Sequence, residues 1–185
     1  MVFIPKTYTS IKDALKLWFS NQTEAQKTYG HISTWDTSEV MYMDKLFQDC
    51  KNFNDDISQW NVSNVTRMDH MFNGAHTFNQ DISQWNVSNV TKMEFMFYSA
   101  RAFNQPLEQW NVSNVSYMQF MFCGAYAFNN GDSENNASNP LNNWNVSKVT
   151  TMEGMFNNAR HFNQPIGNWN VSQVCLLYTS PSPRD

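Results

Sequence analysis

Hydrophobic residues recur along the chain with a period of 25 residues, and a tryptophan opens each period. The tryptophans in this register are Trp35, Trp60, Trp85, Trp110, Trp144 and Trp169. The one longer interval contains residues 130–138, N-G-D-S-E-N-N-A-S, whose composition is typical of a loop. The pattern indicates a repeat protein with one insertion, built from units that must stack to share a core.

Within each unit, the spacing of apolar residues predicts a short strand followed by a short helix. Ile57, Trp60, Val62 and Val65 have the spacing of a leucine-rich-repeat strand, and Trp60 and Val62 alternate with polar neighbours. A capping-box pattern then precedes four apolar residues at helical spacing. These four residues are Met68, Met71, Phe72 and Ala75. The expected fold is a leucine-rich-repeat-like α/β repeat solenoid, with one short strand and one short helix per 25-residue unit.

The residues outside the repeats form two further segments. Residues 1–34 are predicted to form an N-terminal helical cap, because Ile11, Leu15 and Trp18 have helical spacing and Ser10 suits a helix start. Residues 35–174 are assigned to the repeat solenoid. After Val174 the repeat stops, and residues 175–185 resemble a translated sequencing adapter. They are therefore interpreted as a non-native tail, which makes the chain a fragment of a longer protein.

Composition narrows the classes of partner. Only 15% of the residues are charged, the net charge is −4, and lysine and arginine form no run. A nucleic-acid or anionic-membrane partner is not expected, because both require concentrated positive charge. No apolar stretch has the length of a transmembrane helix, and the N-terminus does not resemble a signal peptide. The compartment stays unknown from these features.

The residue types that carry catalysis or bind metals do not recur in a functional pattern. The three cysteines and four histidines have neither zinc-site spacing nor a metalloprotease motif. Asp55, Asp56 and Asp81 precede the predicted strands, but proline occupies this place in other units, so we expect turn formation rather than calcium binding. No catalytic residue, metal or cofactor is expected, and the chain is not expected to be an enzyme.

The repeat W-N-V-S-N-V-T-x-M-x-x-M-F-x-x-A-x-x-F-N-Q resembles that of BspA-like leucine-rich-repeat surface proteins, which include mycoplasma lipoproteins. The resemblance covers Trp35 to Val174. It implies a leucine-rich-repeat fold, a secreted or cell-surface location and a role in adhesion, with no catalytic residues. The chain shows no signal peptide or lipidation cysteine, so the location rests on the resemblance alone.

Two surfaces are candidates for binding. The first is a uniform polar ladder on the predicted strand face, beside the tryptophans. It consists of Gln59, Asn61, Gln84, Asn86, Gln109, Asn111, Asn143, Asn145, Asn168 and Asn170. The second is an aromatic cluster at positions that vary between units. It consists of Phe95, Tyr98, Tyr117, Phe120 and Tyr126, and either packing or partner binding explains it.

Two functional hypotheses follow from these surfaces. The leading one is a non-enzymatic protein-interaction or surface-adhesion scaffold, with a protein or glycan as partner. The alternative is a structural ladder protein whose uniform polar face meets a glycan or ice. The columns that vary between units favour the first hypothesis, and the identical polar columns favour the second.

Overall fold

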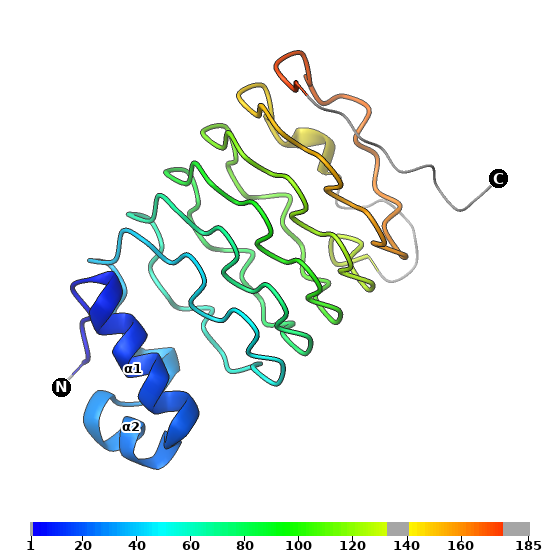
Figure 1. The fold of residues 1–185 in the computed structure, drawn as a ribbon. Coiled ribbons are helices and arrows are strands. Elements are labelled where there is room, and N and C mark those ends of the chain that lie inside the picture. The colour runs from blue at the N-terminus through cyan, green and yellow to red at the C-terminus, as the bar shows by residue number, and fades with distance from the viewer. Residues whose placement is uncertain (1, 133–140, 176–185) are drawn as a thin grey trace.

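The computed structural model of the chain describes residues 2–132 and 141–175. Its helices are α1 (Tyr8–Ser20), α2 (Gln22–Tyr29) and the short 3-10 helices η1 (Ile32–Thr34) and η2 (Leu141–Asn143). The α-helices lie at one end, and the 25-residue units follow as a stack (Figure 1). We call each unit a rung and number the rungs in chain order, so that rung one begins at Trp35 and rung six at Trp169.

The prediction of a leucine-rich-repeat-like α/β solenoid is wrong. Among the described residues, no rung contains an α-helix or an extended strand, and the β pairing between neighbouring rungs consists of isolated parallel bridges. The predicted strand closes into tight turns, because the Val65 N–H donates to the Val62 carbonyl at 2.9 Å. Asn61 Oδ1 also accepts the Ser63 N–H at 3.0 Å. Local bonds of this kind compete with extended structure, and periodicity alone does not reveal them.

The segment predicted as a helix contains two left-handed residues in each of rungs one to five. In rung two these are His70, with φ of 58°, and Gly74, with φ of 73°. Alternate N–H groups donate to rung three instead of to carbonyls four residues earlier, at 2.8–3.0 Å. The donors are Met68, His70, Phe72 and Gly74. A helix of about two turns is marginal by itself, so bonds between rungs determine the conformation.

Two columns of stacked phenylalanines fill the interior of the stack. Each of rungs one to five pairs one ring from each column, and the paired centroids lie 3.8–4.1 Å apart. Between successive rungs the centroids are 5.3–6.0 Å apart. The columns are Phe47, Phe72, Phe97, Phe122 and Phe156, and Phe53, Phe78, Phe103, Phe128 and Phe162. The apolar repeat therefore builds one continuous core.

Each repeat tryptophan from rung two onward ties its rung to the preceding part of the chain. The indole N–H donates to a carbonyl 28 or, across the insertion, 37 residues earlier, at 2.8–3.3 Å. For example, Trp110 Nε1 donates to the Ile82 carbonyl at 3.1 Å, and both residues are buried. The tryptophan thus fills the core with its ring and satisfies a buried acceptor of the neighbouring rung.

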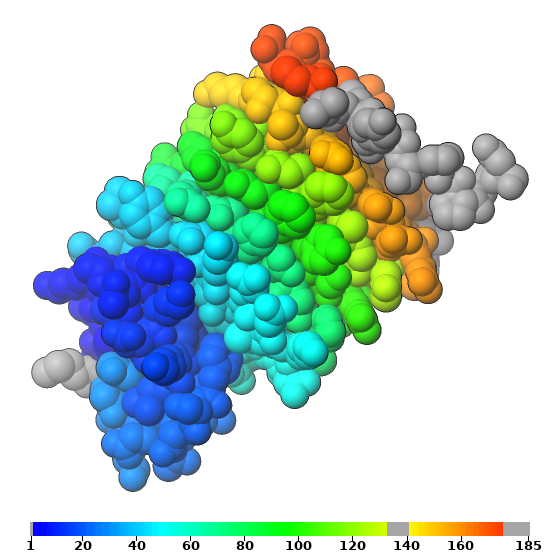
Figure 2. Space-filling view, in the orientation of Figure 1, coloured from blue at the N-terminus to red at the C-terminus, as the bar shows by residue number. Residues whose placement is uncertain are grey.

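The helices lie against rung one, as the space-filling view shows at its blue end (Figure 2). Helix α1 begins at Tyr8, earlier than predicted, because Thr7 is the N-cap and forms a capping box with Ser10. Trp18 Nε1 donates to Asp55 Oδ2 at 2.7 Å, and the Phe19 ring lies 5.9 Å from that of Phe53. Helix α2 follows directly, and its N-cap Asn21 accepts the Glu24 N–H at 3.2 Å.

The predicted insertion and tail lie mostly outside the described residues. Of residues 130–138, only 130–132 are described, and of residues 175–185, only Cys175 is described. The side chain of Asn130 continues the pattern of contacts between rungs, because its Oδ1 accepts the Leu107 N–H at 2.7 Å. Within the described residues, no helix has both the length and the apolar character needed to cross a membrane.

Trp110→Phe tests the tie between rungs. The change leaves the buried Ile82 carbonyl without its donor and removes part of a packed ring, so we expect a loss of about 2–4 kcal/mol in unfolding free energy. Urea denaturation followed by fluorescence measures it. Gln109→Ala, at the exposed neighbouring position, is the control and should cost less than about 0.5 kcal/mol. Equal losses for the two variants would contradict the assigned role of the indole.

Candidate functional site

The left-handed segments present a surface, the turn face, on which rungs with the same backbone carry different side chains. Three columns of side chains run along it. The bridge column is Tyr42, Arg67, Lys92, Tyr117 and Thr151. The ring column is Lys45, His70, Phe95, Phe120 and Gly154. The basic column is Lys51, His76, Arg101, Tyr126 and Arg160. Every member is exposed or partly exposed, so the turn face is where the rungs differ chemically.

Three rings stack along the ring column. The centroids of His70 and Phe95 are 4.7 Å apart, and those of Phe95 and Phe120 are 5.1 Å apart. All three residues have φ between 55° and 58°, which is costly for residues other than glycine. Ring contacts and the bonds between rungs offset this cost. The stack is therefore a rigid, half-buried ridge rather than a row of independent side chains.

The ridge ends at Gly154 for a steric reason. Gly154 has φ of 57°, and a Cβ at this position would lie 2.4 Å from Cε1 of Phe120. The ring of Phe120 therefore occupies the space that a side chain in rung five would need. The close approach of the ring requires glycine here, since other rungs have a side chain at this position with a similar φ.

The predicted aromatic cluster is only partly assembled. Phe95 and Phe120 belong to the ridge, and Tyr98 contacts Phe95 with its centroid 5.8 Å away. Tyr117 lies in the bridge column, is 39% exposed and has Lys92 Nζ 5.4 Å from its ring centroid. Tyr126 lies apart, in the basic column, where its ring contacts are with Arg101 and Arg160. The predicted cluster therefore combines packed and accessible residues: the rings of the ridge are half-buried, whereas Tyr117 is exposed to solvent.

Acidic side chains beside the bridge column shape the electrostatics of the turn face. Arg67 donates to both carboxylate oxygens of Asp69, at 3.0 and 3.1 Å, and Asp69 is buried. Glu94 occupies the same place in rung three and is half-buried, with an unpartnered Oε2. Burial raises the pKa of Glu94, its own backbone N–H opposes the rise, and Asp69 adds to it.

The polar ladder is exposed along its whole length, and all ten predicted residues lie at the surface. It does not lie on a strand, because each of its N-V-S asparagines forms a local turn. In these turns Oδ1 accepts the N–H of the serine two residues later, at 3.0–3.2 Å. The amide Nδ2 groups make no hydrogen bond to described residues, so they are available to a ligand or to water.

A second asparagine column was not predicted. Asn64, Asn89 and Asn114 each donate from Nδ2 to a carbonyl of the preceding rung, at 2.7–2.8 Å. The sequence signal was the last asparagine of N-V-S-N, present in three successive units. These residues stabilise the stack and are part of the scaffold rather than of a binding site.

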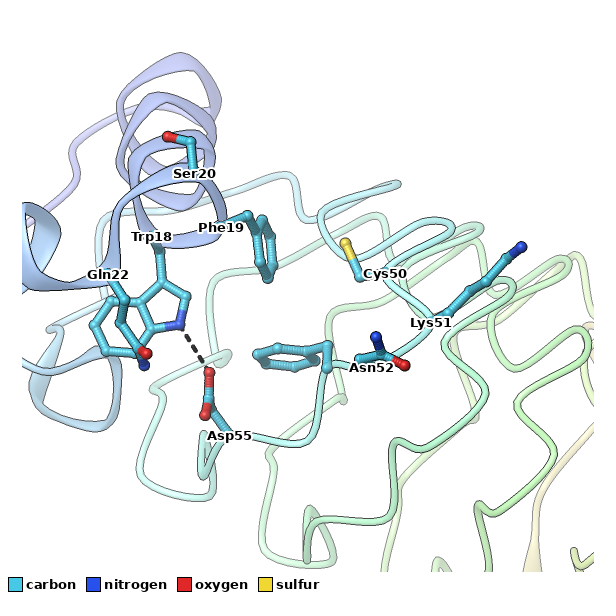
Figure 3. A pocket seen from close by; sticks show the side chains of 9 residues that line it. Trp18, Phe19, Ser20, Gln22, Cys50, Lys51, Asn52 and Asp55 are labelled. Atoms are coloured by element: carbon cyan, nitrogen blue, oxygen red, sulfur yellow. Dashed lines mark hydrogen bonds between the residues drawn. The ribbon is translucent and has the colours of Figure 1, made fainter.

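A cavity of about 580 Å³ lies between α1 and rung one and opens to solvent (Figure 3). Its lining includes Trp18, Phe19 and Phe53, with Cys50 and Lys51 on the rung side. Burial, reinforced by Asp49, raises the pKa of Cys50 to about 11, so its thiol is protonated near neutral pH. Asp55 already accepts the indole N–H of Trp18.

The acidic residues considered for calcium have other roles. Asp56 and Asp81 each accept a serine N–H two residues later, both at 2.9 Å, which is the turn chemistry that was expected. Asp55 accepts the indole N–H of Trp18. Within residues 2–132 and 141–175, no three His, Cys, Asp or Glu side chains are grouped so that they could hold a metal ion.

The basic column was also missed by the sequence reasoning, although its signal was present. The position 16 residues after each repeat tryptophan holds Lys, His, Arg, Tyr and Arg in rungs one to five. Only alignment of the rungs makes these dispersed residues a column, and the net charge of −4 gave no hint of it. Lys51 of this column is seen beside the cavity in Figure 3.

Together these features define a stacked-repeat protein with an invariant core and a variable turn face. The family model described as "Mycoplasma protein of unknown function, DUF285" matches residues 13–136 and 132–179. The chain belongs to this family. Neither the curated proteins nor the solved structures contain a match to it.

Gly154→Ala tests the steric end of the ridge. The left-handed backbone and the contact with Phe120 should together cost more than about 2 kcal/mol of stability. In the double variant Phe120→Ala/Gly154→Ala the losses should fall short of additivity by at least about 1 kcal/mol, because the ring is gone. Gly124→Ala is the control for backbone strain, since its Cβ would meet only Ser99 Oγ at 3.2 Å. Urea denaturation of all variants gives the unfolding free energies for this double-mutant cycle. Strictly additive losses from Phe120→Ala and Gly154→Ala would refute the contact between the two positions.

Glu94→Gln tests the buried carboxyl by its pH dependence. A raised pKa means that the folded state binds more protons than the unfolded state just above the ordinary glutamate range. Stability contributed by protonated Glu94 is therefore lost as pH rises through that range. Thermal melts from pH 4 to pH 7 should show that the variant loses less stability than the wild type. Glu39→Gln, which removes an exposed carboxylate, should behave as the wild type does.

Proposed function

We propose that the chain is a non-enzymatic interaction scaffold of a BspA-like surface protein, which contacts a partner through the turn face. The observation that carries the proposal is the contrast between the buried columns, which hardly vary, and the turn face, which varies from rung to rung on one fixed backbone. A scaffold that holds different side chains in fixed register suits recognition. Membership of a repeat family and the resemblance of the repeat to surface adhesins support the same function.

The aromatic residues of the turn face are the proposed contact points. Tyr117 is 39% exposed and carries both a ring and a hydroxyl, which is the chemistry enriched in binding hot spots. The ridge of Phe95 and Phe120 lies in the same rungs and is fixed by stacking. A rigid ring loses little conformational entropy when it is covered by a partner.

The polar ladder supports a second candidate, a structural protein that meets a glycan or ice. The specific observation in its favour is that all ten amide side chains are exposed in two columns beside the buried tryptophans. Rungs repeat at about 4.8 Å, so the ladder presents hydrogen-bonding groups at regular intervals. Its uniformity suits a repetitive ligand and gives little selectivity among protein partners.

Adhesion of protein-coated beads to epithelial cell monolayers and to extracellular-matrix proteins tests the two candidates. We expect wild-type beads to adhere more than albumin-coated beads, and Tyr117→Ser to reduce adhesion at least about tenfold, which corresponds to a lost hot spot. Tyr42→Ser is the matched control, since Tyr42 lies in the same column of rung one and is 45% exposed.

The outcomes separate the candidates. Retained adhesion by Tyr117→Ser, with loss in Gln84→Lys/Asn86→Lys, would favour the polar ladder, as would thermal hysteresis or selective binding on a glycan array. Equal effects of Tyr117→Ser and Tyr42→Ser would show that position along the stack does not matter. Wild-type adhesion no greater than that of albumin would refute the scaffold proposal.

A further inference from the structure

The basic column is held in register directly by the backbone. In successive rungs, the residue after each column member donates its N–H to the carbonyl of the member before, at 3.1–3.2 Å. The donors are Thr77, Ala102, Ala127 and His161, and the acceptors are Lys51, His76, Arg101 and Tyr126. The column is therefore continuous, with one member in each of rungs one to five, and none of its members is acidic.

Tyr126 holds two arginines of this column in place. Arg101, from the rung before, has its guanidinium carbon 5.7 Å from the ring centroid, and Arg160, from the rung after, has its own at 4.5 Å. Both arginines are exposed. Such cation–π contacts orient a guanidinium without using its N–H donors. The two groups are thus pre-organised and keep their hydrogen-bonding capacity for a ligand.

Neither arginine is neutralised by the described part of the protein. Arg101 and Arg160 make no ion pair or side-chain hydrogen bond with the described residues, whereas Arg67 in the bridge column is committed to Asp69. Burial lowers the pKa of His76, and the charges of Arg101 and Lys51 lower it further, against an opposing effect of Asp49. The charges of the column therefore act on one another, and a polyanion would relieve this repulsion.

We propose that the basic column binds a linear acidic polysaccharide that alternates acidic and neutral sugars. Full positive charges recur at every second rung, on Lys51, Arg101 and Arg160, which corresponds to about 9–10 Å between them. Two pyranose rings of an extended glycan span a comparable length and carry one carboxylate. The forked donors of arginine match a carboxylate in bidentate geometry.

Other polyanions fit this spacing less well. A strand of duplex DNA presents one phosphate per 3.4 Å or so of helix axis and winds around that axis, so its phosphates do not follow the charges of the column. An extended acidic peptide presents same-side carboxylates every 6.6–6.8 Å or so, which also falls out of register after the first contact. The alternating glycan keeps its register over all three cationic rungs, so its contacts add.

This inference rests on the proposed scaffold function and names a ligand class for a second column of the same face. The test uses the full chain and a fluorescein-labelled hyaluronan decasaccharide, with binding measured by fluorescence anisotropy at low and physiological salt. We expect Arg101→Gln and Arg160→Gln each to weaken binding about tenfold, as expected for a lost charge-assisted hydrogen bond. The affinity should also fall with salt, less steeply in the variants.

Three controls accompany the measurement. Lys16→Gln removes an exposed charge of α1 that is not a member of the column, and should bind within about twofold of the wild type. Tyr126→Phe keeps the ring and should bind normally, whereas Tyr126→Leu should weaken binding because both guanidinium groups lose their support. Thermal melts of each variant establish that the stack is folded.

The competing ligands decide the outcome. Hyaluronan that binds no better than neutral dextran, or less tightly than polyglutamate or duplex DNA, would overturn the proposal, as would unchanged binding by Arg101→Gln/Arg160→Gln. Cell adhesion provides the separate readout for the scaffold function. Adhesion that depends on Tyr117 without hyaluronan binding overturns this inference alone, while loss of both overturns the scaffold function as well.

Discussion

The structure depends on the backbone hydrogen bonds between successive rungs. In each turn segment, alternate N–H groups point along the stack, and the groups between them close local turns, as Met71 does on the Met68 carbonyl at 3.1 Å. This arrangement satisfies buried backbone groups without a helix or an extended strand. It requires left-handed residues at fixed intervals, including positions such as Phe95 that are costly outside glycine. Stacked rings and the tryptophan ties offset that cost. The backbone hydrogen bonds between rungs therefore have two effects: they replace the bonds of a helix or a strand, and they fix the register of each rung on the next.

The core columns and the N-terminal helical cap could be predicted from the sequence, because apolar periodicity reports which residues are buried. Met68, Met71 and Phe72 are indeed fully buried, but their helical spacing is produced by left-handed turns. The conformation could not be predicted because the competing bonds come from rungs 24 or 25 residues away. One local signal existed. Asp49, Gly74, Ser99, Gly124 and Asn158 share a column, and most are residue types that tolerate positive φ.

For the candidate surfaces, the exposed positions could be predicted, but the grouping of the aromatic residues could not. The polar ladder is exposed as expected, since residues on either side of a buried tryptophan face outward in almost any conformation. The aromatic cluster was predicted as a group, yet Tyr126 belongs with arginines rather than with Phe95 and Phe120. Tyr126 was misplaced because the prediction assumed a helix in each unit, and a helix would bring the variable positions together on one face. In the observed turns these positions separate into columns, and each column has its own chemistry.

Separation into columns has a consequence for recognition. A helix-per-repeat architecture would mix aromatic and basic side chains on one surface, whereas these turns keep the ring column and the basic column parallel and distinct. Substitution within a column changes one point of contact and leaves the backbone bonds intact, because none of those bonds uses a side chain. The stack can therefore vary its surface chemistry rung by rung without refolding. The limit is steric, and Gly154 shows it: the ring of Phe120 occupies the space that a Cβ in the next rung would need, so no side chain fits there. Neighbouring rungs are thus coupled in what they can carry, although their backbones are alike.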